Sequence, residues 1–487
     1  MVMTPSPNAP ANWTAAALAS HVARMLVMRE GEFAVIGLGR SGEAVARLLR
    51  RAQVAVYASD KSTTSATQEA AGRLGREGAA VDVGTHDLAR IARASCVVVS
   101  PGVPPSAPPL EAARAAGVPI VSEVEIALRL SPALQYIAVT GTNGKTTTTA
   151  MIGALLRALG HDAVDVGNIG TPVSDLPLQE PAPTWAALEL SSFQLADTPG
   201  VQPNVGVLTT LSPDHLDRYA SVADYYADKK RLFANATSAS RWVTTADNTD
   251  VDAMVQGIPG RWARFSVRRR DVEAWYDRKT DQLQVLGAPL MSRQSLALDG
   301  DHNVANALAA LLAVMLASPA HQTPQARQQL AAALMAFRPL SHRLEPVGEA
   351  HGVRWLNDSK ATNVSSALVA IQGMTRPTVL LLGGRHKGEP YTALLPALAQ
   401  HARAVLAYGE AAPIIAADLE QALHEQAPAV TFADLRDASF HEVVAQARAL
   451  AQPGDVILLS PACSSFDMFR NYEERGRRFA ELAQEMA

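Results

Sequence analysis

The sequence predicts an α/β protein of three domains, and three observations lead to this fold class. Apolar segments of strand length alternate with helical patterns along most of the chain, as they do in proteins with parallel sheets. The 487 residues are enough for about three domains, each with a core of its own. Proline-containing junctions at Ser131-Pro132 and near Pro339 interrupt the alternation. We therefore expect domains at 1–131, 132–339 and 340–487.

The composition is that of a compact enzyme. Charged residues make up 18% of the chain and the formal net charge is −4, so there is no electrostatic reason to expect nucleic acid or an anionic membrane as a partner. The best candidate for a membrane span, residues 307–317, is too short, and residues 1–12 have the composition of a tail. Cys96 and Cys463 form neither a disulfide framework nor a metal motif. We expect a cytoplasmic, monomeric protein.

The first domain is expected to bind a diphosphate. Residues 33–50, FAVIGLGRSGEAVARLLR, read as a strand, a glycine turn with Gly37, Gly39 and Gly42, and a helix. Asp60 ends the next strand, as in dinucleotide-binding, Rossmann-like domains. Three interpretations stay open: an NAD-dependent enzyme, a site for another nucleotide-linked ligand, and a turn that serves only packing.

The central domain begins with a phosphate-binding loop, which predicts a P-loop ATPase-like unit. Residues 136–156, YIAVTGTNGKTTTTAMIGALL, run from an apolar strand through a glycine turn into a helix. Backbone N–H groups would face the anion, Lys145 would supply a charge, and the Thr146 hydroxyl could reach Mg²⁺. Val139 stands where the usual motif has glycine. An NAD enzyme has no use for such a lysine, so two phosphate sites indicate ATP on one domain and a nucleotide-linked substrate on another.

Two further features of the central domain suit metal-dependent phosphate chemistry. Glu189 ends the strand WAALE, where its carboxylate could share Mg²⁺ with Thr146. The helical pattern of residues 222–232 places Lys229 on the apolar face and Lys230 toward solvent. The alternative interpretation of Glu189 is a solvated loop residue. The alternative for Lys229 is a side chain whose aliphatic part is buried while its ammonium group stays in solvent.

The rest of the chain predicts an edge of short strands and a third, Rossmann-like α/β domain. Residues 240–298 read as short alternating segments, which predicts an antiparallel edge or flap, and residues 301–317 read as a helix. Beyond Pro339, the strands TVLLLGG, AVLAYG and DVILLSPAC each end in a polar or glycine turn. Because open parallel sheets bind ligands beyond the carboxyl ends of their strands, we expect a third ligand site there.

A set of motifs carries a family resemblance. GTNGKT, ELSSFQL, DHLDRY, YYADKKRLF, GDHNVANALAA, SHRLEPV, NDSKATN and SPACSSFDMFRNYEERG occur in that order. From about residue 33 to the C-terminus the chain resembles the Mur ligases of peptidoglycan synthesis, whose P-loop is shortened as in residues 141–146. The last two motifs are most similar to the branch that adds D-glutamate. Residues 1–30 and 265–295 lie outside the resemblance.

The resemblance implies four groups of site residues. It implies ATP binding by Gly141, Thr142, Asn143, Gly144, Lys145, Thr146, Thr147, Asn303, Asn306, Arg343 and Asp358. It implies UDP-sugar binding by Gly39, Ser41, Asp60, Asn168, Ser191 and Gln194. It implies an amino-acid pocket of Lys360, Thr362, Lys387, Ser465 and Phe466. Two Mg²⁺ ions would be held by Thr146, Glu189, His215 and Lys229, the lysine as a carbamate, with Lys145, Lys229 and His215 as catalytic residues.

The implied activity is that of an ATP-dependent amide ligase in the cytoplasmic stage of cell-wall synthesis. The carboxylate of UDP-N-acetylmuramoyl-L-alanine would attack the γ-phosphorus of ATP, and the amine of D-glutamate would attack the resulting acyl phosphate. The base that deprotonates this amine is open, with His215 as one candidate. The alternatives are another Mur ligase, a folylpolyglutamate synthase-like ligase, a non-enzymatic nucleotide-binding regulator and an NAD-dependent dehydrogenase.

Overall fold

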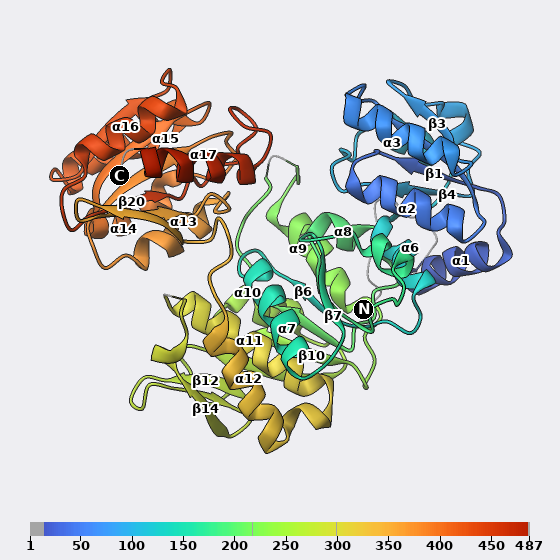
Figure 1. Ribbon diagram of the computed structural model, residues 1–487, viewed down its shortest axis with the longest axis horizontal. Coiled ribbons are helices and arrows are strands. Elements are labelled where there is room, and N and C mark those ends of the chain that lie inside the picture. Colours follow the sequence, from blue (N-terminus) through green and yellow to red (C-terminus); the bar gives the residue numbers. More distant parts are fainter. Residues whose placement is uncertain (1–13, 217, 299, 486–487) are drawn as a thin grey trace. The chain divides into compact units, whose positions relative to one another are not determined.

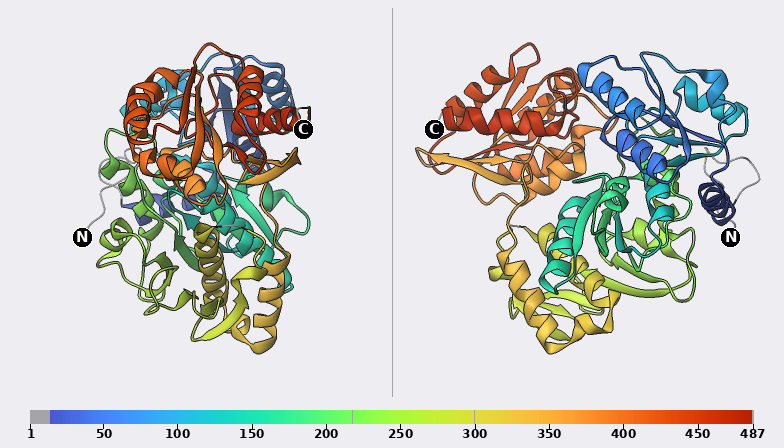
Figure 2. Two further views of the ribbon diagram at one scale, coloured as in Figure 1. Left: turned by 90° about the vertical axis from the view of Figure 1, so that its left-hand side faces the viewer. Right: turned by 45° about the vertical axis from the view of Figure 1, so that its right-hand side comes forward.

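A computed structural model of the chain describes residues 14–216, 218–298 and 300–485, and these residues form three sheets with helices between the strands (Figure 1, Figure 2). The α/β class and the three sheets expected from the sequence are confirmed. The chain divides into two compact units. The first contains residues 14–211, Tyr226–Arg293 and Ala305–Met335, and the second contains Ser212–Tyr225, Gln294–Val304 and the residues from Ala336 onward.

The first sheet is parallel throughout, with the strand order β3-β2-β1-β4-β5. Because β1 pairs with both β2 and β4, the glycine turn that follows β1 opens at the middle of the sheet. Of these strands, β1 and β2 are the ones that the sequence predicts. The strands are β1 (Glu32–Ile36), β2 (Ala55–Asp60), β3 (Ala80–Val83), β4 (Cys96–Val99) and β5 (Ile120–Ser122). The helices are α1 (Ala15–Met28), α2 (Arg40–Arg51), α3 (Ser65–Arg76), α4 (Leu88–Ile91), α5 (Pro108–Ala115) and α6 (Glu123–Leu130).

The second sheet belongs to the same unit and has the order β14-β13-β12-β11-β10-β9-β6-β8-β7. The strands are β6 (Gln135–Thr140), β7 (Ala163–Gly167), β8 (Trp185–Glu189), β9 (Val205–Leu208), β10 (Arg241–Thr245), β11 (Arg261–Ser266), β12 (Ala274–Asp277), β13 (Gln282–Val285) and β14 (Ala288–Ser292). The helices are α7 (Lys145–Ala158), α8 (Ser192–Ala196), α9 (Val222–Lys230), α10 (Thr249–Val255), α11 (Asp301–Ala317) and α12 (Pro324–Ala336), with 3-10 turns at η1 (Val173–Leu178), η2 (Arg231–Phe233), η3 (Arg293–Ser295) and η4 (Pro319–Gln322).

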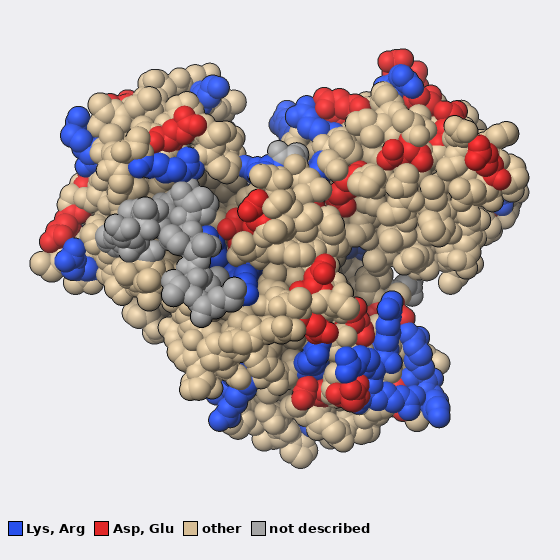
Figure 3. Space-filling view, turned by 180° about the vertical axis from the view of Figure 1, so that it is seen from behind, with Lys and Arg blue, Asp and Glu red and all other residues tan. Residues whose placement is uncertain are grey.

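The predicted antiparallel edge at 240–298 is only partly right. β12, β13 and β14 pair in antiparallel fashion, but β10 and β11 continue the parallel part of the sheet. Their alternating polar residues suggested a solvated edge, but the neighbours β9 and β12 cover both flanks of the pair. Figure 3 shows Lys and Arg side chains on this edge mixed with Asp and Glu, as in the pairs Arg269–Asp271 and Arg270–Asp277.

The third sheet lies in the second unit, with the order β15-β16-β20-β17-β18-β19. Only the β15–β16 pair is antiparallel, and apolar clusters cover both faces. The strands are β15 (Glu345–Ala350), β16 (Val353–Asn357), β17 (Thr378–Gly383), β18 (Ala402–Tyr408), β19 (Thr431–Leu435) and β20 (Val456–Leu459). The helices are α13 (Val364–Gln372), α14 (Leu395–His401), α15 (Ala412–Gln426), α16 (Phe440–Leu450) and α17 (Tyr472–Glu485), with a 3-10 turn at η5 (Tyr391–Leu394).

Several smaller expectations can be compared with the described residues. Helix α11 is confirmed, and its residues 307–315 are fully buried. Among residues 14–216, 218–298 and 300–485, no helix combines the length and apolar character that crossing a bilayer requires. Cys96 and Cys463 are both buried and unpaired. Burial raises the pKa of the Cys96 thiol, and it raises the pKa of Cys463 to about 12. The expected tail at residues 1–12 lies outside the described residues.

Candidate active site

The phosphate-binding loop joins β6 to α7 and depends on two glycines in the left-handed region. Gly141 has φ 144° and Gly144 has φ 82°, which glycine adopts without steric cost. A Cβ at Gly144 would lie 2.5 Å from Asn306 Oδ1. The Asn306 amide oxygen also accepts a hydrogen bond from Thr148 Oγ1 at 3.3 Å. Asn306, which the resemblance assigns to ATP binding, therefore lies beside the phosphate-binding loop in the first unit.

Two threonines that the sequence interpretation missed hold the loop in place. The Thr142 N–H donates to the Thr210 carbonyl oxygen at 2.7 Å, and the Asn143 N–H donates to Thr210 Oγ1 at 3.1 Å. Thr209 Oγ1 donates to the Asn143 carbonyl oxygen at 2.6 Å. Both threonines directly follow β9, the strand beside β6. A polar pair directly after the apolar run Val205–Leu208 was the signal that could have indicated them.

Two lysine ammonium groups meet at one carbonyl oxygen of the loop. Lys145 Nζ donates to the carbonyl oxygens of Gly141 at 3.0 Å and Thr142 at 2.7 Å. Lys229 Nζ donates to the same Gly141 oxygen at 2.7 Å, and the Lys229 side chain is almost fully buried. Lys230 is partly exposed. The helical-face prediction, with Lys229 inward and Lys230 outward, is therefore confirmed.

Glu189 lies at the carboxyl end of β8, next to the loop strand β6. Its partner in register on β6 is Val139, and its side chain is buried. Oε1 accepts a hydrogen bond from Asn168 Nδ2 at 2.9 Å, whereas Oε2 has no hydrogen-bond partner among the residues described. A buried carboxylate oxygen of this kind fits a cation, and Mg²⁺ needs few protein ligands when phosphate oxygens supply the rest. Thr146, on the first turn of α7, is also buried.

Within the described ranges, no three His, Cys, Asp or Glu side chains gather as metal ligands. His215 belongs to the segment Ser212–Tyr225 of the second unit and has φ 57°. Its N–H donates to Asp214 Oδ1 at 2.7 Å. Asp217, which the sequence places beside it, lies outside the described residues.

The glycine turn of the first domain is held by Asp60. A Cβ at Gly42 would lie 1.8 Å from the Gly37 carbonyl oxygen, so the turn needs glycine there. Asp60 Oδ2 accepts from the Leu38 N–H at 2.6 Å and Oδ1 accepts from the Ser62 N–H at 2.7 Å. Its carboxylate therefore stabilises the turn itself, a role that the fingerprint did not predict.

The remaining residues predicted for the UDP-sugar lie in different places. Gly39 precedes α2 with open space around it, since an added Cβ would meet no heavy atom within 4 Å. Ser41 is on the first turn of α2. Ser191 and Gln194 hydrogen-bond to each other in the capping box of α8. Asn168 contacts Glu189 rather than the glycine turn.

The second unit brings the predicted amino-acid residues to one edge of its sheet. Lys360 and Thr362 follow β16, Ser465 and Phe466 follow β20, and Lys387 follows β17. These three strands are neighbours in the order β16-β20-β17, and all three are parallel. The loops are tied together, because the Ala462 N–H donates to the Ala361 oxygen at 2.9 Å and the Arg385 N–H donates to the Ser464 oxygen at 2.8 Å.

The two cationic side chains of this edge have different surroundings. Lys387 is buried, and its Nζ pairs with Asp214 Oδ1 at 2.5 Å. Burial would raise the pKa of Asp214, but the Lys387 ammonium and then His215 outweigh it and hold that pKa well below its usual range. Lys360 Nζ lies over the Tyr472 ring, 5.2 Å from its centroid. Phe466 is 61% exposed.

The other residues predicted for the adenine nucleotide lie in the second unit. Asn303 and Arg343 line a cavity of about 100 Å³ in the second unit. Asp358 is buried nearby and accepts a hydrogen bond from Ser460 Oγ at 2.9 Å. Burial raises the pKa of Asp358 to about 6, although the Arg343 charge opposes the rise.

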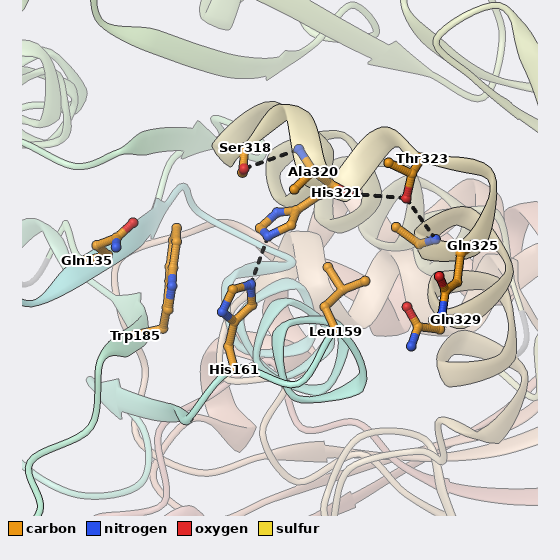
Figure 4. Close-up of a pocket in the computed structure, with 11 residues that line it drawn as sticks. Gln135, Leu159, His161, Trp185, Ser318, Ala320, His321, Thr323, Gln325 and Gln329 are labelled. Carbon is orange, nitrogen blue, oxygen red and sulfur yellow. Dashed lines mark hydrogen bonds between the residues drawn. The ribbon is translucent and has the colours of Figure 1, made fainter.

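A larger pocket of the first unit lies at the opposite edge of the second sheet. Gln135 begins β6 and Trp185 begins β8, so this pocket faces the amino ends of the strands whose carboxyl ends carry the phosphate loop and Glu189 (Figure 4). His161 Nε2 and His321 Nε2 lie 2.8 Å apart in it. None of the predicted site residues lines the pocket.

The phosphate-binding loop with Lys145 follows β6, in the parallel part of the second sheet, and this arrangement is that of α/β proteins of the P-loop class. Residues 31–122 match the family model of the Mur ligase MurD-like N-terminal domain, 139–314 the Mur ligase middle domain, and 342–463 the Mur ligase glutamate ligase domain. The chain belongs to the Mur ligase family. The alternatives of an NAD-dependent dehydrogenase and a non-enzymatic regulator are therefore dropped.

Similar proteins extend over most of the chain. A UDP-N-acetylmuramoylalanine–D-glutamate ligase of Acidobacterium capsulatum is 38% identical, covering 92% of this chain and 95% of its own. The protein of the same name from Anaeromyxobacter dehalogenans is 40% identical, with coverages of 93% and 97%.

Solved structures share the fold at low sequence identity. The UDP-N-acetylmuramate-alanine ligase MurC of Thermotoga maritima has a TM-score of 0.57 at 19% identity, covering 94% of this chain and 100% of its own. MurF of Acinetobacter baumannii has a TM-score of 0.58 at 15% identity, with coverages of 97% and 99%. These two structures support the fold alone.

Proposed function

We propose that this chain joins D-glutamate to UDP-N-acetylmuramoyl-L-alanine and converts ATP to ADP and phosphate, in the cytoplasmic stage of peptidoglycan synthesis. The names of relatives that align over nearly their whole length support the substrate pair. The observation that carries the chemistry is the meeting of Lys145 and Lys229 at the Gly141 carbonyl oxygen of the phosphate loop. Lys145 is predicted to bind phosphate. Burial of the charged Lys229 side chain is unfavourable, so we infer that this lysine has a function at the site.

In the first step the substrate carboxylate attacks the γ-phosphorus of ATP and gives an acyl phosphate and ADP. Lys145 and the N–H groups at the start of α7 align the phosphates and neutralise developing charge. When bound, Mg²⁺ adds charge neutralisation between the phosphate oxygens. We assign one ion to Thr146 and Glu189 and the second to His215, and the Lys229 carbamate would support the pair.

We assign Lys229 a carbamate. The Lys229 ammonium loses one proton, its nitrogen adds to the carbon of CO2, and a second proton is released, so a buried cation becomes an anion that can support a metal ion. A buried ammonium beside a second ammonium is unfavourable, which favours this change. Carbon-13 NMR of the protein in ¹³C-bicarbonate should show a carbamate signal that Lys229→Met lacks and Lys230→Met keeps. A wild-type spectrum without the signal would remove the carbamate.

In the second step the amine of D-glutamate attacks the acyl carbonyl, and the tetrahedral intermediate expels phosphate. We assign the amino acid to Lys360, Thr362, Lys387, Ser465 and Phe466, because two cations suit a dicarboxylate and the three loops share one edge of the sheet. We further place the UDP-sugar on domain 1–131, ATP on 132–339 and the amino acid on 340–487, one sheet each.

The test is phosphate release from ATP and Mg²⁺ with UDP-N-acetylmuramoyl-L-alanine and a panel of amino acids. Release that depends on D-glutamate, with the coupled product identified by mass spectrometry, is the expected result. Release with L-alanine or a diamino acid instead, or with a folate substrate and L-glutamate, would assign the chain to a different ligase activity.

A further inference from the structure

The proposed coupling needs a group that removes a proton from the incoming ammonium, and the second unit offers one outside the predicted pocket. Glu389 lies in the loop after β17, two residues beyond Lys387. This loop is one of the three that meet at the carboxyl edge of β16, β20 and β17. Glu389 therefore shares a short segment of backbone with a residue predicted to bind the amino acid.

The Glu389 carboxylate has an unused acceptor. The residue is 8% exposed, and its Oε1 has no hydrogen-bond partner among the described residues. Asp214, Lys387 and Tyr391 are the charged or titratable groups that face it, and the Val364 N–H at the start of α13 donates to the carboxylate. Burial first, and then the Asp214 charge, raise the pKa of Glu389 to about 7, while Lys387 and the Val364 N–H oppose the rise.

Asp214 shows how a carboxylate binds beside Glu389. One of its oxygens accepts from Lys387 Nζ at 2.5 Å, and the other accepts from Asn363 Nδ2 at 2.8 Å. These donors form a cradle for a carboxylate group, and the carboxylate of an amino acid is the same chemical group. A substrate carboxylate that takes the place of Asp214 on Lys387 would place the amino acid beside the loop that carries Glu389.

We infer that Glu389 is the general base for the incoming amine, an inference that rests on the proposed function. One N–H proton of the D-glutamate ammonium moves to Glu389 Oε1, and its electron pair stays on nitrogen. The neutral amine then forms the C–N bond. The C–O bond breaks with its electron pair on the departing phosphate, and the nitrogen loses its second proton to that phosphate, which leaves the amide. A base whose pKa lies near the working pH is the most effective one. The alternative is that Glu389 serves only as a second counter-ion for the buried Lys387.

The test compares two nucleophiles on the same variant. Hydroxylamine is neutral at neutral pH and attacks an acyl phosphate without a base, so it reports acyl phosphate formation alone. In Glu389→Gln, hydroxamate formation from UDP-N-acetylmuramoyl-L-alanine and ATP should stay near wild type. Coupling of D-glutamate should fall by about 10²- to 10⁴-fold. Glu410→Gln, which removes an exposed carboxylate paired with Arg385, is the matched control and should keep both reactions.

The pH profile separates a base from a counter-ion. In wild type, kcat/KM for D-glutamate should rise with pH through an acid limb near 7. In Glu389→Gln, kcat/KM for D-glutamate should not rise near pH 7. It should rise only at higher pH, where the ammonium group of free D-glutamate loses its own proton. Glu389→Asp should recover part of the limb.

Each outcome decides between the two proposals. Equal loss of hydroxamate formation and coupling would make Glu389 a structural counter-ion and overturn the inference. Wild-type coupling by Glu389→Gln would overturn it as well, and in both cases the proposed function stands. A wild-type protein that forms neither hydroxamate nor coupled product would instead refute the proposed function, and the inference with it.

Discussion

At the scale of single residues, Lys145 supplies an ammonium group to the phosphate loop. Lys145 Nζ donates to two loop carbonyl oxygens, which places the ammonium inside the turn of 141–144. Loss of one preorganised electrostatic contact commonly costs about 3 kcal/mol or more of transition-state stabilisation. We predict that Lys145→Ala lowers kcat for phosphate release by at least about 10²-fold. Lys230→Ala, which removes a partly exposed ammonium, should leave the rate unchanged.

The measurement is steady-state phosphate release at saturating ATP, with circular dichroism to confirm folding of both variants. Turnover of Lys145→Ala within a few-fold of wild type would exclude the loop from the first chemical step.

Two glycines of the turn that follows β1 allow a second test at the scale of single residues. A Cβ at Gly42 meets the Gly37 carbonyl oxygen at 1.8 Å, whereas a Cβ at Gly39 meets no heavy atom within 4 Å. We predict that Gly42→Ala lowers the free energy of unfolding by about 1–3 kcal/mol, and that Gly39→Ala changes it little. Urea unfolding of both variants checks this difference, and equal stabilities would contradict the packing of the turn.

At the scale of elements, α6 connects the first two sheets through a buried acid. Glu123 begins α6, is almost fully buried, and its Oε2 accepts from the N–H of Ser174 at 3.1 Å and from Ser174 Oγ at 2.5 Å. Burial raises its pKa from 4.5 to about 6. A raised carboxyl pKa stabilises the fold below the unfolded value, and this stabilisation is lost as pH rises through the folded value.

We therefore predict that the free energy of unfolding falls between pH 4.5 and about 6 and that Glu123 is one cause of this fall. A pKa difference of this size corresponds to about 2 kcal/mol. Glu123→Gln cannot titrate, so its unfolding free energy should fall less across this range. Glu111→Gln, on the exposed face of α5, should follow wild type. Parallel pH profiles of all three proteins in urea unfolding would remove Glu123 as the cause.

The elements show which parts of the fold the sequence predicts. Long apolar runs followed by glycine or polar turns predict strands such as β1, β6 and β17 correctly, because a strand buried on both faces needs such a run. Strands β3 and β19 were not predicted, since partial burial leaves their sequences mixed. Contacts over long separations were also missed. Asp214 and Lys387 are 173 residues apart, and no local pattern joins them.

At the scale of the whole molecule, the described surface suits a monomer. The large apolar side chains that are exposed there are Val27, Met28, Leu88, Met335, Ile414, Phe466 and Met468. Apart from Val27–Met28 and Phe466–Met468 they are separated along the chain, and obligate interfaces need large apolar areas. We predict that light scattering gives the mass of a single chain over a range of concentrations. A stable dimer mass would contradict this.

The buried state of both thiols has a practical consequence. Cys96 and Cys463 have raised pKa values and no exposed sulfur, and the thiolate is the species that reacts with maleimides and iodoacetamides. The native chain should therefore be nearly inert to such reagents while it is folded. A single cysteine introduced at an exposed position can carry a fluorophore or spin label, and neither natural cysteine needs to be removed first.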